Sequence, residues 1–306
     1  MLARSLLLRL ANSKNLESFV RRNRWSARAA RRFVAGETIE EAILSVSALN
    51  AQGISASLDL LGESVRNQGQ VAETLDTYLR VFQAIREHSL NCNVSLKLTA
   101  LGLDIDEELC YRNMVSLLGT GGPDEFIRID MESSDYTQRT LDLFARLWEG
   151  PEKFRNVGVV IQAYLRRSDD DVERLIGMGA RVRLCKGAYK EPDTVAFPNK
   201  ADVDANYVRM MRRLLTDGVY PGIATHDEKM IAATRDWARE QNIEPSRYEF
   251  QMLYGIRRDL QTSLVKDGYR MRVYTPFGTF WYPYLMRRLA ERPANMVFVL
   301  KNMLRG

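Results

Sequence analysis

Eight short apolar runs, separated by longer amphipathic ones, constrain the fold of this chain more than any other feature. The runs that read as strands are Ile54–Leu61, Val94–Leu98, Phe126–Met131, Val157–Tyr164, Arg181–Cys185, Gly222–Thr225, Tyr248–Leu253 and Arg270–Tyr274. Helical periodicity marks most of the intervals, as in Val71–His88, Asp135–Glu149, Asp169–Met178, Asp202–Thr216, Glu228–Gln241 and Arg257–Lys266. Eight strands that alternate with helices predict a (β/α)8 barrel of the TIM type.

The charge of the N-terminus differs from that of the rest of the chain. Residues 1–36 hold nine Lys or Arg and one Glu, a net charge of +8, which leaves −3 for the other 270 residues. We therefore expect a helical arm at residues 1–46 and one barrel domain at residues 47–306, since a barrel needs roughly 250 residues. Such an arm could contact anionic lipid or nucleic acid, or it could pack as a solvated helix on its own domain.

Composition excludes several classes of protein. No apolar stretch approaches the roughly 20 residues of a membrane span, and Arg4 and Arg9 interrupt the apolar run near the N-terminus, which argues against a secretory signal. The three cysteines are odd in number and far apart, which is typical of reduced thiols. With two histidines and no cysteine pairs, a zinc or copper site is not expected. These features predict a cytoplasmic protein with no metal.

Polar residues recur where the predicted strands end. They include Glu63, Lys97, Asp130, Glu132, Gln162, Arg183, Lys186, Thr225, His226, Gln251 and Tyr274, with Gly187, Ala188 and Leu253 beside them. TIM barrels carry their active sites at the carboxyl ends of the strands. Because polar groups are costly to bury without partners, their recurrence in all eight strands predicts a polar ligand at this end of the barrel.

A helical run near the C-terminus, Tyr284 to Glu291, carries two adjacent arginines. Arg288 follows Tyr284 by four residues, and Glu291 follows Arg287 by four, so these side chains can share one broad face. Two guanidinium groups suit a small carboxylate, because each presents a planar fork of donors. The alternative is a solvated basic patch paired with Glu291.

Individual motifs leave other functions open. Gly177-Met178-Gly179 lacks the third glycine of a dinucleotide fingerprint and precedes a strand, so it reads as a turn. Lys97 or Lys186 could form a Schiff base in an aldolase, although ion pairing or anion binding also suits them. His226 could be a general base or a ligand contact. A nucleic-acid-binding protein led by the basic arm is disfavoured, because the body is net acidic and has no recognition motif.

Taken in order, eight motifs make the chain similar to the proline dehydrogenase family over about residues 50–300. They are Ser95-Leu96-Lys97-Leu98, Ile129-Asp130-Met131-Glu132, Val160-Ile161-Gln162-Ala163-Tyr164, Arg181 to Tyr189, Ala224-Thr225-His226-Asp227, Glu249 to Gly255, Tyr274-Thr275-Pro276-Phe277-Gly278 and the helix with Arg287 and Arg288. The resemblance is to the monofunctional type, since no aldehyde dehydrogenase portion is present. It implies a distorted (β/α)8 barrel with an N-terminal helical extension and a C-terminal helix over the barrel mouth.

The resemblance also implies a cofactor and a reaction. FAD is expected to lie across the barrel mouth and to oxidise L-proline at C5 to Δ1-pyrroline-5-carboxylate, with electrons passing to a membrane quinone. The implied cofactor contacts are Asp130, Gln162, Arg183, Lys186, Gly187, Ala188, Lys200, Thr225, His226, Gln251, Arg288 and Glu291. A peripheral contact with the inner face of the membrane, through the basic arm, is expected with the quinone, and no contact with nucleic acid.

For the substrate, the resemblance places Lys97, Arg287 and Arg288 around the proline carboxylate. The apolar ring is expected against Leu184, Ala188, Leu253, Tyr274 and Tyr284. The implied catalytic set is Lys97, Asp130, Arg183, Tyr274, Arg287 and Arg288, and the implied gate over the site is the pair Glu63 and Arg183. Two departures from the family pattern are Pro293, which biases the preceding residue away from helix, and the stretch 190–200, which leaves the adenine end of the cofactor site unassigned.

Overall fold

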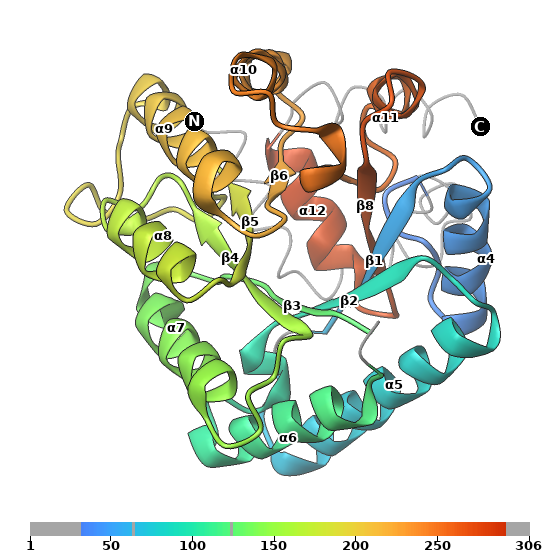
Figure 1. Ribbon diagram of the computed structural model, residues 1–306. Helices are drawn as coiled ribbons and strands as arrows, with labels where there is room; N and C mark the ends of the chain where they lie inside the picture. The colour runs from blue at the N-terminus through green and yellow to red at the C-terminus, as the bar shows by residue number, and fades with distance from the viewer. Residues whose placement is uncertain (1–31, 63–64, 123–124, 292–306) are drawn as a thin grey trace.

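The computed structural model describes residues 32–62, 65–122 and 125–291, apart from the side chains of Arg287, Leu289, Ala290 and Glu291. Within these ranges eight parallel strands close into a barrel in sequence order (Figure 1). The strands are β1 (Ser55–Leu60), β2 (Cys92–Leu96), β3 (Ile127–Ile129), β4 (Val157–Gln162), β5 (Arg181–Cys185), β6 (Gly222–Ala224), β7 (Glu249–Leu253) and β8 (Met271–Phe277). The predicted barrel and all eight strands are confirmed, with ends that differ by three residues or fewer.

Helices surround the barrel as a ring in Figure 1. They are α4 (Ile39–Asn50), α5 (Gln68–Glu87), α6 (Glu107–Thr120), α7 (Ser134–Glu149), α8 (Ser168–Gly177), α9 (Lys200–Asp217), α10 (Glu228–Glu240) and α11 (Arg258–Lys266). The remaining described elements are α12 (Trp281–Glu291) and the short 3-10 turns η1 (Leu98–Leu101) and η2 (Pro245–Arg247). Side chains at the N-caps start several of them, as where Asp106 accepts from the Glu108 amide and Asp227 from the Lys229 amide. None of the described helices is both long and apolar enough to cross a membrane.

The two faces of the strands bury different kinds of side chain. In β1, Ala56 and Leu58 are fully buried in the apolar core that packs the outside of the barrel against the helices. Ser57 and Asp59 alternate with them, and Ser57 bonds across the barrel interior to β2 and β5. The interior of a TIM barrel is usually filled by Val, Ile and Leu. Here polar and charged side chains fill much of it.

Helix α4 crosses the expected boundary between residues 46 and 47. Its buried residues Ala42, Ile43, Val46 and Leu49 belong to the same core as the strands. This face of α4 therefore packs on the barrel, because an apolar helix face is stable only against another apolar surface. The remainder of the expected arm, residues 1–31, lies outside the described residues.

Helix α12 lies over the carboxyl end of the barrel. It follows β8 directly, and in Figure 1 it lies within the ring of helices. A separate apolar cluster joins Trp281, Tyr284 and Leu285 of α12 to Leu61, which follows β1, and to Ile256, which follows β7. Since both partners lie just beyond carboxyl ends of strands, this contact confirms the predicted helix over the barrel mouth.

The cysteines are free thiols. Cys92 and Cys110 are buried and Cys185 is half-buried, and burial raises the pKa of Cys185 to about 11. In the part of the chain that the structure describes, no group of three or more His, Cys, Asp or Glu residues is placed to hold a metal ion.

Two glycines make room for the large polar side chains of the interior. A Cβ atom on Gly158 of β4 would lie 2.6 Å from Arg128 Nη1 and 2.4 Å from the Arg181 carbonyl oxygen. A Cβ atom on Gly222 of β6 would lie 2.4 Å from Gln251 Nε2. Real contacts are never this short, so a larger residue at either position must displace its neighbours.

We expect Gly158→Ala to lower the free energy of unfolding by about 1–3 kcal/mol, the usual cost of overpacking a core. The matched control is Gly177→Ala at the end of α8, because no heavy atom beyond the local helix backbone lies within 4 Å of the added methyl group. Alanine is the better helix former, so that variant should equal or exceed the wild type. Urea unfolding of the three proteins measures both changes. Equal stability for Gly158→Ala and Gly177→Ala would contradict the close packing around Arg128.

Candidate active site

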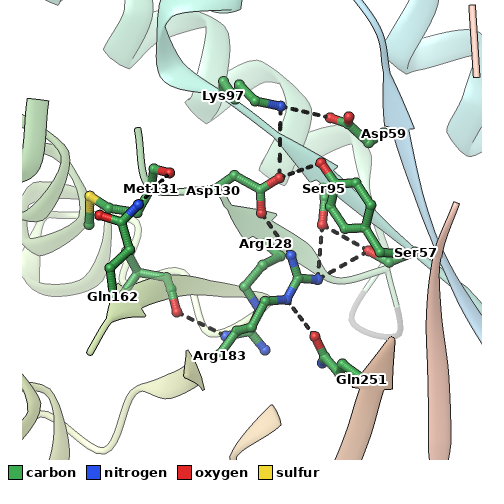
Figure 2. A network of polar contacts seen from close by, with 12 residues as sticks. Ser57, Asp59, Ser95, Lys97, Arg128, Asp130, Met131, Gln162, Arg183 and Gln251 are labelled. Carbon is green, nitrogen blue, oxygen red and sulfur yellow. Dashed lines mark hydrogen bonds and ion pairs between the residues drawn. The ribbon is translucent and has the colours of Figure 1, made fainter. Parts of the chain in front are cut away.

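Arg183 lies at the centre of a polar network inside the barrel (Figure 2). Its Nη1 donates to Asp130 at 2.7 Å, and its Nε donates to Gln251 of β7. Its Nη2 donates to Ser95 of β2 at 3.0 Å and to Ser57 of β1 at 3.5 Å. The side chain is only 5% exposed, so these bonds replace the water that a guanidinium group loses on burial.

Asp130, just after β3, links Arg183 to two further predicted site residues. Its Oδ2 accepts from the Tyr274 hydroxyl at 2.7 Å and lies 4.0 Å from Lys97 Nζ. Burial, followed by the nearby carboxylate of Asp130, raises the pKa of Tyr274 well above its ordinary value, so the phenol stays neutral and donates. Lys97 also donates to Asp59 of β1 at 3.3 Å. The structure thus brings Lys97, Asp130, Arg183 and Tyr274 together.

A second buried charge pair lies next to this network, toward the amino ends of the strands. Arg272 Nε donates to Glu249 Oε1 at 2.7 Å, and Gln251 Nε2 donates to the same oxygen at 2.6 Å. Burial acts to raise the pKa of Glu249, but the charge of Arg272 and these hydrogen bonds lower it overall. Burial and the nearby charge of Arg183 lower the pKa of Arg128 well below its ordinary value.

Lys186 and Lys200, both predicted cofactor contacts, meet at a pair of carboxylates. Lys186 Nζ lies 2.5 Å from Asp204 on α9 and 2.8 Å from Asp227. Lys200 pairs with Asp204 and lies 3.6 Å from Asp227. Desolvation opposes ionisation of Asp204 and Asp227, yet their bonds to Lys186 lower the pKa of both. The carboxylates balance the two cations in this structure.

The residues after β6 tie its end to β7 and α10. His226 Nε2 accepts the Leu253 amide at 2.9 Å, so this nitrogen carries no proton in that arrangement. The Thr225 hydroxyl accepts the Asp227 amide at 3.0 Å at the start of α10. Both contacts are structural, which accounts for the Thr-His-Asp sequence without a ligand. Their predicted cofactor roles remain predictions.

Gln162 at the end of β4 and Gly187 after β5 lie at the carboxyl end of the barrel. Gln162 is buried, its Nε2 donates to the Met131 carbonyl at 3.4 Å, and its Oε1 has no hydrogen-bond partner among the described residues. Gly187 has a φ of +102°, and a Cβ atom there would lie 2.3 Å from the Tyr164 ring. Glycine is therefore required at this turn.

On α12 the structure describes one of the two predicted arginines fully. The Arg288 guanidinium carbon lies 5.3 Å from the centre of the Tyr284 ring, as expected for residues four apart on a helix. Tyr284 is buried in the cluster that covers the mouth, which Leu253 also contacts. The side chains of Arg287 and Glu291, and the gate residue Glu63, lie outside the described residues.

Known proteins with this sequence pattern share a name. A family profile described as "Proline dehydrogenase" matches residues 42–301. Proline dehydrogenase 2 of Bacillus subtilis is 44% identical over 305 residues, which cover 99% of both chains. Proline dehydrogenase of Deinococcus radiodurans is 41% identical over 312 residues, covering 100% of this chain and 99% of that protein.

This chain belongs to the proline dehydrogenase family.

A solved structure and the bifunctional relatives agree with the monofunctional type. The crystal structure of proline utilization A from Bdellovibrio bacteriovorus superposes with a TM-score of 0.81 at 29% identity, over 87% of this chain and 33% of that chain. The bifunctional protein PutA of Escherichia coli is 33% identical, and the matched part covers 23% of it. The chain therefore spans a third or less of these PutA proteins but nearly all of the monofunctional relatives.

Two further residues of the expected substrate wall lie on β5 and just after it. Leu184 follows Arg183 along β5 and is fully buried in the apolar core. Its predicted contact with the substrate remains a prediction. Ala188 lies exposed in the segment after β5, and its predicted contact with the substrate likewise remains a prediction.

Sequence reasoning missed several members of the network. Ser57, Asp59, Ser95, Glu249 and Arg272 are all at least nine-tenths buried. The signal was present as period-two alternation: in Ser55–Leu60 polar residues alternate with Ala56, Leu58 and Leu60. Both faces of this strand are buried in the barrel, so alternating polar residues indicate that its inner face packs against other polar groups.

We expect Asp130→Asn to lower the free energy of unfolding by about 1.5–3 kcal/mol, because Arg183 loses its hydrogen bond to a charged partner while remaining buried. The control is Asp76→Asn. The Asp76 carboxylate pairs with Arg80, and the two side chains are 69% and 59% exposed. Exposed pairs contribute at most about 1 kcal/mol. Guanidinium unfolding of both variants gives the comparison, and equal effects would show that Asp130 does not support Arg183.

Proposed function

We propose that this protein uses FAD to oxidise L-proline to Δ1-pyrroline-5-carboxylate and passes the electrons to a quinone. The observation that carries the proposal is the network of Arg183, Asp130, Tyr274 and Lys97 beneath α12, at the carboxyl end of the barrel. Enzymes with this fold react at that end. Membership of the proline dehydrogenase family supports the substrate.

The residues at the mouth fit a flavin. The buried Gln162 Oε1 without a partner suits an N–H donor of the flavin ring system. Arg183 would supply positive charge near the ring, which favours the reduced, more anionic form. Lys186, Lys200, Gly187, Thr225 and His226 would hold the phosphate and ribityl part. Because Asp204 and Asp227 already pair with both lysines, a pyrophosphate must share these ammonium groups.

The protein contributes placement of the substrate. Lys97 from the barrel, with Arg287 and Arg288 from α12, would grip the proline carboxylate, and hydrogen bonds to charged groups contribute about 1.5–3 kcal/mol each. This grip orients C5, which is the main source of rate when two reactants are held together. Tyr274, Tyr284 and Leu253 would line the ring. Bound FAD supplies the acceptor for the hydride that leaves C5, while the nitrogen lone pair forms the imine.

The proton on the proline nitrogen leaves before hydride transfer. Asp59 and Asp130 both face Lys97, and Asp130 also accepts from Arg183 and Tyr274. Carboxylates bonded in this way are poor bases, so we assign deprotonation to solvent, before α12 covers the site. The apolar cluster of α12 would then exclude water from the reacting centre.

Quinone reduction and gating complete the proposal. The basic arm, with its charge of +8 on residues 1–36, would bring the protein to an anionic membrane surface that holds the quinone. Glu63 would pair with Arg183, and this pair would form a gate over the flavin and the substrate. The Schiff-base alternative loses support, because the attacking amine must be neutral, whereas Lys97 and Lys186 each lie beside two carboxylates.

We expect the purified protein to be yellow and to lose its flavin absorbance when L-proline is added without oxygen. A short-chain quinone added afterwards should restore the colour, because it accepts the electrons. Anaerobic absorbance spectra measure both steps. A colourless protein that cannot be loaded with FAD would refute the proposal, and trapping of a keto acid on Lys97 or Lys186 by borohydride would support the aldolase instead.

We expect Arg288→Met to raise KM for proline by about tenfold or more, the effect of losing one hydrogen bond to a charged group. FAD content should stay unchanged. Arg258→Met on α11 is the matched control, because Arg258 also lies over a tyrosine, with its guanidinium carbon 5.6 Å from the centre of the Tyr254 ring. Steady-state kinetics of both variants make the comparison, and an unchanged KM in Arg288→Met removes this residue from the carboxylate site.

A further inference from the structure

Glu249 and Gln251 lie two residues apart on the inner face of β7. They are 3% and 4% exposed. Glu249 Oε1 accepts from Gln251 Nε2 at 2.6 Å and from Arg272 Nε at 2.7 Å, while the Tyr220 hydroxyl donates to Glu249 Oε2 at 3.1 Å. Gln251 in turn accepts from Arg183 Nε through its Oε1. A continuous chain of hydrogen bonds thus joins Glu249 to the guanidinium group of Arg183.

The donor and acceptor roles in this series of hydrogen bonds follow from the groups at its two ends. An ionised carboxylate only accepts hydrogen bonds, and Arg183 Nε only donates. The amide of Gln251 between them must present its NH2 group to Glu249 and its oxygen to Arg183. The reverse orientation would set oxygen against oxygen and N–H against N–H. Arg272 keeps Glu249 ionised, since its charge and hydrogen bond lower the pKa of that carboxyl despite its burial.

Close packing around Gln251 restricts the conformation of its side chain. A Cβ atom on Gly222 of β6 would lie 2.4 Å from Gln251 Nε2 and 2.9 Å from its Cδ. The amide therefore fills the space that glycine leaves, with Glu249 on one side and Arg183 on another. With Nε held by Gln251, the other nitrogens of Arg183 are directed to Asp130 and Ser95 (Figure 2).

We propose that Glu249 is a positioning residue, which fixes the orientation of the Gln251 amide and through it the guanidinium plane of Arg183 beside the flavin. In this role Glu249 would contact neither substrate nor cofactor. It acts on the reaction only by way of Gln251. This role rests on the proposed function, because it assigns to Arg183 the place next to the cofactor.

A double-mutant cycle on the full-length holoenzyme tests the role. Glu249→Gln replaces the charged acceptor of the Gln251 NH2 group with a neutral amide that can also donate. The Gln251 amide, and with it the oxygen that bonds Arg183 Nε, is then held less firmly. We expect this variant to reduce its flavin about tenfold more slowly at saturating proline, the effect of one hydrogen bond to a charged group. In a Gln251→Met background, the same change at 249 should alter the rate less than about twofold, because the connection is already broken.

Stability and spectra separate positioning from a general structural role. Glu249→Gln should lower the midpoint of urea unfolding in both backgrounds, because Arg272 loses its charged partner in each. The flavin absorption maximum and midpoint potential should shift with Glu249→Gln only when Gln251 is present. Tyr220→Phe is the matched control: it removes the contact to Glu249 Oε2 and leaves Oε1 alone, so the reduction rate should not change.

The variant Gly222→Ala tests the same connection without changing Glu249, so the test does not depend on whether Glu249→Gln folds. The added methyl group displaces the Gln251 amide and leaves the Glu249–Arg272 pair in place, so it should slow flavin reduction. Additive effects in the cycle, or an unchanged rate in Gly222→Ala, overturn the positioning role. A wild-type protein that does not react with proline overturns the proposed function itself, and that result is seen before any variant is compared.

Discussion

The burial of Arg183 inside the barrel is the constraint on which the site depends. A guanidinium group out of water needs acceptors in fixed directions, and here they come from four places: Asp130 after β3, Gln251 on β7, and Ser95 and Ser57 on β2 and β1. Once these partners are bonded, the barrel interior is polar. The apolar contacts that stabilise the fold then lie outside, between the strands and helices.

Charge and shape are coupled in this interior. Two of the long side chains inside the barrel fit because the neighbouring strand carries a glycine beside them: Gly158 of β4 lies beside Arg128 of β3, and Gly222 of β6 lies beside Gln251 of β7. Polar groups that fill such a space must also be satisfied, since a partly satisfied network is less stable than an apolar core. Glu249 and Arg272 satisfy the amino-terminal side of the network, which leaves Asp130 and Lys97 for the mouth.

The sequence allowed the barrel and the place of its site to be predicted, because both follow from local patterns: apolar runs of strand length and polar residues where those runs end. Partners were not predictable in the same way. Arg183 and Ser57 bond across 126 positions of sequence, and Lys186 meets Asp204 on the following helix. Leu184 and Ala188 were placed beside the substrate by the family resemblance, and their contacts with it remain predictions.

The two sides of the mouth are held by different kinds of contact, and the proposed reaction would join them. Lys97 is fixed to β1 and β3 by Asp59 and Asp130 within the barrel. Arg288 belongs to α12, and its guanidinium group lies over the Tyr284 ring of the same helix. Helix α12 reaches the barrel through apolar contacts with Leu61 and Ile256, and Trp281 Nε1 at its start donates a hydrogen bond to Glu37 at 2.7 Å. In the proposed reaction, a substrate carboxylate bonded to both Lys97 and Arg288 would join these two sides, and it would thereby couple closure of the site to the presence of proline.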